Sequence, residues 1–119
     1  MGKDVEMSKR VLLDTNFLLV PLQFGVDIYD QLKGQSLFTL SSCINELEGK
    51  RLGKAAFNLL QQYNLKIVKT LGKGDSAIIN HAKKYKCKVA TNDRELIKTL
   101  KRYRIRIIRL RQKKYLEEE

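Results

Sequence analysis

The sequence predicts an α/β domain with a central, mostly parallel sheet and helices on both faces. Short apolar runs rich in Val, Leu and Ile alternate with longer segments that carry apolar residues at helical spacing, which is the pattern of strand–helix–strand units. Parallel strands buried on both faces are continuous apolar runs, as these are. The chain has 119 residues, 43% of them hydrophobic, which is enough for a single core and one domain.

Five strands are expected from the apolar runs. Residues 11–14 form the first strand, because Val-Leu-Leu is a buried-type run that ends on a charge. The others are expected at residues 37–40, 65–68, 88–91 and 105–110. Right-handed crossovers between these strands favour the order 3-2-1-4-5, with strands 1 and 4 flanking the point where the order reverses.

The segments between the strands predict helices. Gly34 is placed to end a helix at residues 26–33, and Ser41 or Ser42 to cap the helix that contains Glu46. Further helices are expected at residues 54–63, from Asp75 onward, and at 93–102. The connection at 16–25 contains the single proline and is expected to hold a helical turn.

Residues 10–116 are expected to form the domain. Residues 1–9 are a mostly polar extension without the apolar centre of a signal peptide, and residues 117–119 are expected to be a frayed acidic tail. The longest apolar stretch is too short for a membrane span. Cys43 and Cys87 belong to no metal-binding or disulfide pattern, which favours a reducing cytosol. A soluble, cytoplasmic protein with no membrane partner is therefore expected.

The charge of the chain favours a polyanionic partner. Lys and Arg number 24 against 13 Asp and Glu, a net charge of +11, and nucleic acid is the most frequent partner of such proteins. Basic residues concentrate between 83 and 114, where Asp93 and Glu95 are the only acids. A solvated basic surface, as in some thermophile proteins, is the alternative. The candidate RNA-binding residues are Arg94, Lys98, Lys101, Arg102, Arg104 and Arg106.

Four acidic residues, Asp14, Glu46, Asp75 and Asp93, each follow one of the expected strands. The carboxyl ends of parallel strands meet at one edge of a sheet, so these carboxylates are expected to converge there. Grouped carboxylates repel one another, and a bound divalent cation is the usual compensation. Oxygen ligands without His or Cys select Mg²⁺ or Mn²⁺, which could activate a water for phosphodiester hydrolysis.

Each acid also has a simpler interpretation when it is considered alone. Asp75 and Asp93 could cap helices, and Glu46 could be an ordinary surface residue. Asp14 fits such a role least, because an acid at the end of a buried strand needs a partner or a metal. Three short polar residues beside the acids could orient ligands or the attacking water: Thr15, Asn16 and Thr91.

Four segments resemble, in the right order, the motifs of PIN-domain nucleases. They are Val-Leu-Leu-Asp-Thr-Asn at 11–16, Ser-Ser-Cys-Ile-Asn-Glu-Leu-Glu at 41–48, Gly-Asp-Ser-Ala-Ile at 74–78 and Val-Ala-Thr-Asn-Asp-Arg-Glu-Leu at 89–96. The resemblance covers residues 10–116 and implies a single PIN-like domain. It implies Mg²⁺- or Mn²⁺-dependent endoribonuclease activity on single-stranded RNA, often in a homodimer. It also implies catalytic metal-site roles for Asp14, Glu46, Asp75 and Asp93, with Asn16 and Thr91 in support.

Within this family, the sequence resembles most the eukaryotic small-subunit processome endonuclease and its archaeal relatives. That resemblance implies rRNA maturation, with a ribosome-assembly protein as partner. The toxin PIN proteins are next nearest and would imply tRNA or rRNA cleavage and an antitoxin partner, and a catalytically idle RNA-binding module is the third alternative. Glu95 departs from the pattern, since many relatives have an aspartate there. The extra terminal segments of the eukaryotic relatives, one of them cysteine-rich, are not found in this sequence.

Overall fold

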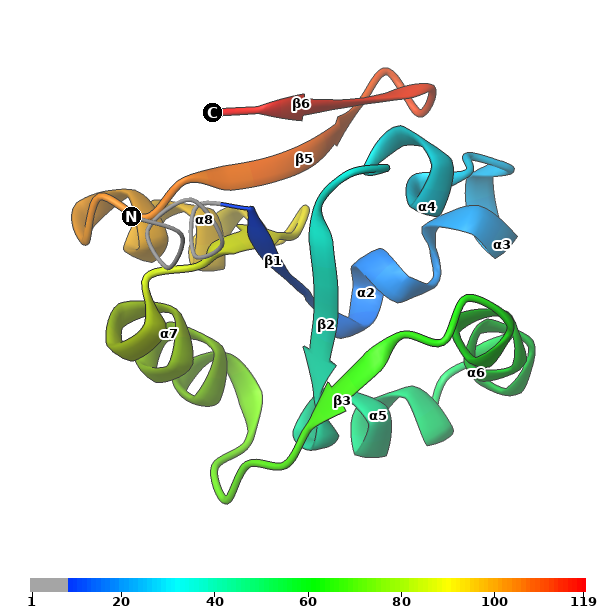
Figure 1. The fold of residues 1–119 in the computed structure, drawn as a ribbon, viewed down its shortest axis with the longest axis horizontal. Helices are drawn as coiled ribbons and strands as arrows, with labels where there is room; N and C mark the ends of the chain where they lie inside the picture. The colour runs from blue at the N-terminus through cyan, green and yellow to red at the C-terminus, as the bar shows by residue number, and fades with distance from the viewer. Residues whose placement is uncertain (1–8) are drawn as a thin grey trace.

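The computed structural model describes residues 9–119, which fold around one six-stranded sheet with helices on both sides (Figure 1). The strand order is β3-β2-β1-β4-β5-β6. The first five strands are parallel, and β6 is antiparallel to β5. The predicted α/β class and the order 3-2-1-4-5 are confirmed, and one strand is added.

The strands are short, and β1 lies between β2 and β4. Leu12 of β1 pairs with Phe38 of β2 on one side and with Val89 of β4 on the other. The strands are β1 (Arg10–Leu13), β2 (Ser36–Leu40), β3 (Lys66–Val68), β4 (Lys88–Ala90), β5 (Ile107–Arg111) and β6 (Tyr115–Glu118).

Helices connect the parallel strands, as expected for right-handed crossovers. The connection predicted at 16–25 contains two short helices, and Pro21 lies in the first turn of the second, where its missing N–H is not needed. The helices are α2 (Thr15–Leu18), α3 (Val20–Phe24), α4 (Ile28–Gln31), α5 (Ser41–Glu48), α6 (Gly53–Gln62), α7 (Gly74–Tyr85) and α8 (Arg94–Arg102).

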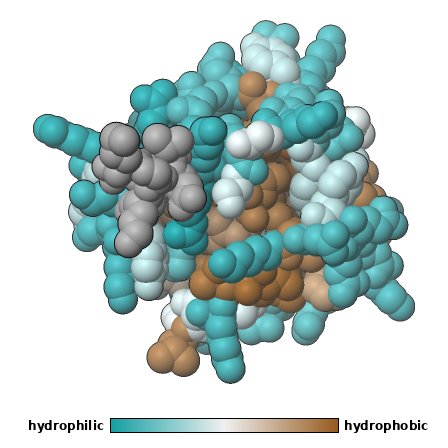
Figure 2. All heavy atoms as spheres, in the orientation of Figure 1, coloured by the Kyte–Doolittle hydropathy of each residue, from teal (hydrophilic) through white to brown (hydrophobic). Residues whose placement is uncertain are grey.

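The sheet separates two hydrophobic clusters, because successive side chains of a strand point to opposite faces. Val11 and Leu13 pack with α2, α3, α4 and α6 on one face. Leu12 packs with α7 and α8 on the other face. Figure 2 shows a mostly hydrophilic surface on one side of the molecule, with hydrophobic residues visible where β2 and β3 lie. Within residues 9–119, no helix combines the length and hydropathy that a membrane span requires.

The acidic end of the chain forms β6, and the prediction of a frayed tail at residues 117–119 is wrong. Glu118 accepts from Lys88 Nζ at 2.8 Å and from Arg106 Nε at 2.6 Å, and Glu119 pairs with Lys101 at 2.8 Å. The segment lacks an apolar strand pattern, and its partners are distant in sequence. The N-terminal extension predicted at 1–9 lies outside the described residues, apart from residue 9.

The turn between α5 and α6 leads to a prediction about stability. A Cβ at Gly53 would lie 1.9 Å from the Leu47 carbonyl oxygen, so the backbone would have to shift. We expect Gly53→Ala to lower the free energy of unfolding by about 1–3 kcal/mol, measured by denaturant titration. Gly49→Ala is the matched control, since its Cβ would meet Glu46 O at an ordinary 3.8 Å. Equal destabilisation by the two substitutions would contradict this explanation.

Candidate active site

The four predicted acids, Asp14, Glu46, Asp75 and Asp93, lie at the carboxyl edge of the parallel strands, which we call the acidic edge. Asp14 directly follows β1 and caps α2, and Glu46 lies in the second turn of α5, which begins where β2 ends. Asp75 lies in the first turn of α7, after β3. Asp93 follows β4 and caps α8. Because the strands are parallel, all four residues lie at the same edge of the sheet.

Asp14 is held rigidly between β1 and β4. Its backbone N–H donates to Ala90 O at 3.0 Å. Its Oδ1 accepts from Thr15 N at 2.7 Å, and its Oδ2 accepts from Thr91 Oγ1 at 2.8 Å. Asp14 is only 6% exposed, and both threonines are buried. Packing and hydrogen bonds together therefore fix the orientation of this carboxylate.

Thr15 and Thr91 link Asp14 to two of the other acids. The Thr15 hydroxyl donates to Glu46 Oε2 at 2.8 Å and also lies 3.3 Å from Cys43 O. The Thr91 hydroxyl, which donates to Asp14, accepts from Asp93 N at 3.1 Å. A continuous series of contacts thus runs from Glu46 through the two threonines to Asp93.

The remaining predicted residues differ in how they are held. Asp93 Oδ1 accepts from Glu95 N at 3.0 Å and from Leu96 N at 3.2 Å, so this carboxylate caps a helix as well as lying at the acidic edge. Asp75 and Asn16 are exposed. Glu95 is also exposed, in the first turn of α8.

Negative charge accumulates at this edge without a basic partner. Burial raises the pKa of Asp14, and the charges of Asp75 and Glu46 raise it further, against the lowering effect of its hydrogen bonds from Thr91 and Thr15. Burial also raises the pKa of Asp75, and the charges of Asp93 and Glu46 add to that shift. None of the ion pairs formed within residues 9–119 involves these four acids. The site therefore favours a cation.

Whether this edge can hold a metal ion depends on the type of ligand atoms and on the spacing of the carboxylates. As the side chains are placed, no three Asp, Glu, His or Cys residues in the described part of the chain are grouped closely enough to hold one ion. Several carboxylate oxygens accept instead from backbone and hydroxyl donors. Mg²⁺ keeps several waters and binds proteins through one or two carboxylates. A water-rich Mg²⁺ or Mn²⁺ site fits this set of oxygen ligands.

A cleft beside Glu46 was not predicted from the sequence. Its volume is about 570 Å³, and α5 and the loop at 70–74 line it. Thr70 N donates to Ser41 Oγ at 3.0 Å, which holds the loop against the start of α5. Gly72 and Gly74, on either side of Lys73, were the sequence signal for such a loop. The cleft is large enough for a small ligand such as a nucleotide.

The structure divides the predicted RNA-binding residues between two edges of the sheet. Arg94 and Lys98 are exposed on the first turns of α8, beside Asp93, whereas Lys101 and Arg102 lie at the far end of that helix. Arg104 and Arg106 precede β5, so they lie at the amino edge, opposite the acids.

Comparisons with known proteins bear on the family and the fold of the chain. Residues 11–113 match the family described as "PIN like domain". The sequence is 32% identical to Ribonuclease VapC9 of Archaeoglobus fulgidus over 95 residues, covering 71% of this chain and 70% of that protein. The solved structure described as "Structure of the PIN domain endonuclease Utp24" aligns with a TM-score of 0.77, covering 92% of this chain and 90% of that chain, at 24% identity. At that identity, the structural match supports the fold alone.

The raised pKa of Asp14 generates a prediction about stability and pH. An acid with a higher pKa in the folded state stabilises the fold fully only below its unfolded pKa, near 3.8. This contribution is lost as the pH rises through the folded pKa. Without divalent cations, we therefore expect Asp14→Asn to have a higher Tm than the wild type at neutral pH. The difference should shrink as the pH falls toward 3.8.

Thermal unfolding monitored by circular dichroism, in EDTA and across this pH range, measures the effect. Asp30→Asn is the control, because Asp30 is an exposed aspartate on α4, away from the acidic edge. We expect its effect on stability to stay within about 0.5 kcal/mol. A wild type that is more stable than Asp14→Asn at neutral pH in EDTA would show that the cost of burying the Asp14 charge is not the dominant effect.

Proposed function

The chain belongs to the PIN-like domain family, and we propose that it is a divalent-metal-dependent endoribonuclease that cleaves single-stranded RNA. The main observation in support is the placement of Asp14, Glu46, Asp75 and Asp93 at one sheet edge, with the pKa values of two of them raised partly by mutual repulsion. The name of one similar protein, Ribonuclease VapC9, agrees with this reaction class.

Asp14 is the proposed centre of the metal site, because its neighbours already fix its orientation. Bound Mg²⁺ or Mn²⁺ would lower the pKa of a coordinated water and offset charge that develops on the phosphate. Glu46 and Asp93 would flank Asp14, with Thr15 and Thr91 setting their spacing as positioning residues. Asp75 is exposed to solvent, and its raised pKa suits it to accept the proton that the attacking water releases.

The RNA would reach this edge from two sides. The cleft beside Glu46 would hold a nucleotide next to the scissile phosphate, with Lys73 at its lining. Arg94 and Lys98 are exposed beside Asp93, where they would contact phosphates. Short-range attraction by these cations would draw the RNA to a site whose own charge repels it.

We propose RNA maturation, with rRNA as substrate, as the biological role. A toxin-type ribonuclease held by an antitoxin is the second candidate, favoured by the 32% identity to Ribonuclease VapC9. Sequencing of RNA crosslinked to the protein in cells would separate the two, since rRNA precursors are expected for maturation and mature tRNA or rRNA for a toxin. Both cysteines are buried and free, which suits the proposed cytoplasmic location.

The proposed chemistry predicts the products of cleavage and their dependence on the acids. Attack by a metal-activated water should leave 5′-phosphate and 3′-hydroxyl ends, and EDTA should abolish cleavage. Asp14→Asn and Asp93→Asn should each lower the cleavage rate by about 10³-fold or more, with RNA binding nearly intact. Gel analysis of end-labelled RNA measures the rates and the end groups.

The exposed Asp30→Asn variant, with the same chemical change, should cleave at the wild-type rate. Products that end in a 2′,3′-cyclic phosphate would contradict the proposal. Cleavage that survives chelation would contradict it as well.

The predicted RNA path generates a separate prediction about salt dependence. Arg94→Gln with Lys98→Gln should weaken RNA binding across sequences and lower the slope of log affinity against log salt by about two, one for each lost phosphate contact. Turnover at saturating RNA should change little. Lys50→Gln with Arg51→Gln removes the same charges from an exposed turn after α5 and should have a smaller effect. Equal slopes for the two double variants would mean that net charge alone sets the affinity.

A further inference from the structure

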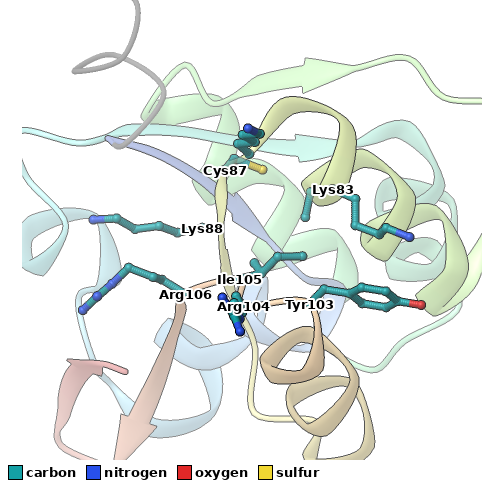
Figure 3. A pocket seen from close by; sticks show the side chains of 9 residues that line it. Lys83, Cys87, Lys88, Tyr103, Arg104, Ile105 and Arg106 are labelled. Atoms are coloured by element: carbon teal, nitrogen blue, oxygen red, sulfur yellow. The ribbon is translucent and has the colours of Figure 1, made fainter.

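A second pocket, of about 470 Å³, lies at the amino edge of the sheet (Figure 3). It is formed where α7 and α8 end and where β4 and β5 begin, whereas the carboxylates follow the opposite ends of the strands. Ala82, Cys87 and Ile105 give it an apolar floor, and Tyr103 forms a wall. Within residues 9–119, its other lining residues are all basic: Lys83, Lys86, Lys88, Arg104 and Arg106.

The positive charges that line the pocket outnumber the negative charges around it within residues 9–119. The ends of α7 and α8 each carry about half a negative charge, which a nearby cation would offset. Glu118 accounts for one more negative charge, through its pairs with Lys88 and Arg106. In the described part of the chain, neither Lys86 nor Arg104 forms an ion pair. The pocket therefore keeps a net positive charge and favours an anion.

Lys86 and Arg104 have left-handed backbone conformations, with φ of 52° and 59°. They end the turns that follow α7 and α8, where glycine is the usual residue because it has no Cβ to strain. Two neighbouring helices thus end in the same unfavourable conformation, each with a cationic side chain beside one pocket. Neutralising a helix end does not require a charge at the strained position itself, since both helices already have basic residues in their last turns.

Tyr103 adds an exposed aromatic surface to the pocket. Tyr103 is 50% exposed, and Lys83 Nζ lies 4.0 Å from the centroid of its ring. Figure 3 shows Lys83 and Tyr103 at one end of the pocket, Lys88 and Arg106 at the other, and Ile105 and Arg104 between them. The cations are spread along the pocket and do not converge on one point, an arrangement that suits successive phosphates of a strand.

We propose that this pocket binds a segment of single-stranded RNA away from the cleavage site. A base would stack on Tyr103, and the adjoining phosphates would contact Lys86, Arg104 and the other cations. Aromatic stacking combined with a basic groove is how proteins hold single strands without reading their sequence. An acidic protein would use the charges but would have less need of the aromatic wall and apolar floor. The inference rests on the proposed RNA substrate, but it uses none of the residues at the acidic edge.

The pocket lies close enough to the acidic carboxylates for one RNA to reach both. Lys88 and Asp93 are joined by a short segment that spans about 18 Å at most. A stacked strand rises about 3.4 Å per nucleotide, so about five nucleotides cover that straight-line distance. A single strand of about 20 nucleotides is therefore long enough to occupy both sites.

Tyr103→Trp tests the stacking directly, because the chain contains no tryptophan. The substitution is made in the uncleaving Asp14→Asn protein, and a single-stranded RNA of about 20 nucleotides is added. Tryptophan emission should be quenched in parallel with the rise in fluorescence anisotropy of labelled RNA. Tyr115→Trp is the matched control, because Tyr115 is 40% exposed and lies on β6, and its emission should not change.

Comparing uridine monophosphate with the RNA shows whether the pocket binds a free nucleotide or a strand. The mononucleotide should not quench the emission at concentrations at which the RNA saturates. Quenching at equal or lower concentrations would identify a nucleotide site and overturn the proposal. RNA binding by anisotropy without any change in Trp emission would also overturn it, while the proposed nuclease function would stand. No binding of RNA at all would contradict both.

Lys86→Gly and Arg104→Gly test the charges and relieve the backbone conformation at the same time. Each substitution should leave Tm unchanged or higher, because glycine adopts a positive φ without strain. Each should also weaken RNA binding and lower the salt slope by about one. Lys113→Gly is the matched control, since Lys113 is an exposed lysine with φ of 56° in the turn between β5 and β6. RNA affinities of the pocket variants equal to that of Lys113→Gly would overturn the proposal.

Discussion

Mutual repulsion among four carboxylates is the constraint on which the rest of this structure depends. Parallel strands that end side by side bring Asp14, Glu46, Asp75 and Asp93 to one edge, and burial of Asp14 makes its charge more costly still. The fold resists this repulsion with a hydrophobic cluster on each face of the sheet. The hydroxyls of Thr15 and Thr91 then fix three of the acids relative to one another.

Most of the positive charges lie at other parts of the sheet. The acidic β6 pairs with basic residues on and around β5, so part of the large positive charge serves to attach the last strand. Arg94 and Lys98 are exposed beside Asp93, and further cations surround the pocket at the amino edge. A negative site within a positive molecule can attract RNA from a distance and still reserve a place for a divalent cation.

Much of the fold could be predicted from the sequence, because alternating apolar runs and helical segments dictate a parallel sheet and its order. The positions of the four acids followed from that topology. β6 could not be predicted, because Tyr-Leu-Glu-Glu has no apolar alternation and is held by ion pairs to distant residues. Arg104 and Arg106 were predicted to bind RNA, but their grouping with Lys83, Lys86 and Lys88 around one pocket was not, because only the folded chain brings the ends of α7 and α8 together. The fine spacing of the carboxylates depends on threonine hydroxyls, which no periodicity reveals.

A crystal structure with Mn²⁺ is the most direct test of the central claim, because anomalous scattering locates this ion independently of any assumption about its ligands. The account predicts an anomalous peak at the acidic edge, next to Asp14 and within reach of at least one of Glu46, Asp75 and Asp93, with waters completing the coordination. The same peak should be lost in Asp14→Asn. Mn²⁺ bound elsewhere, with the acidic edge free of metal at saturating concentration, would contradict it.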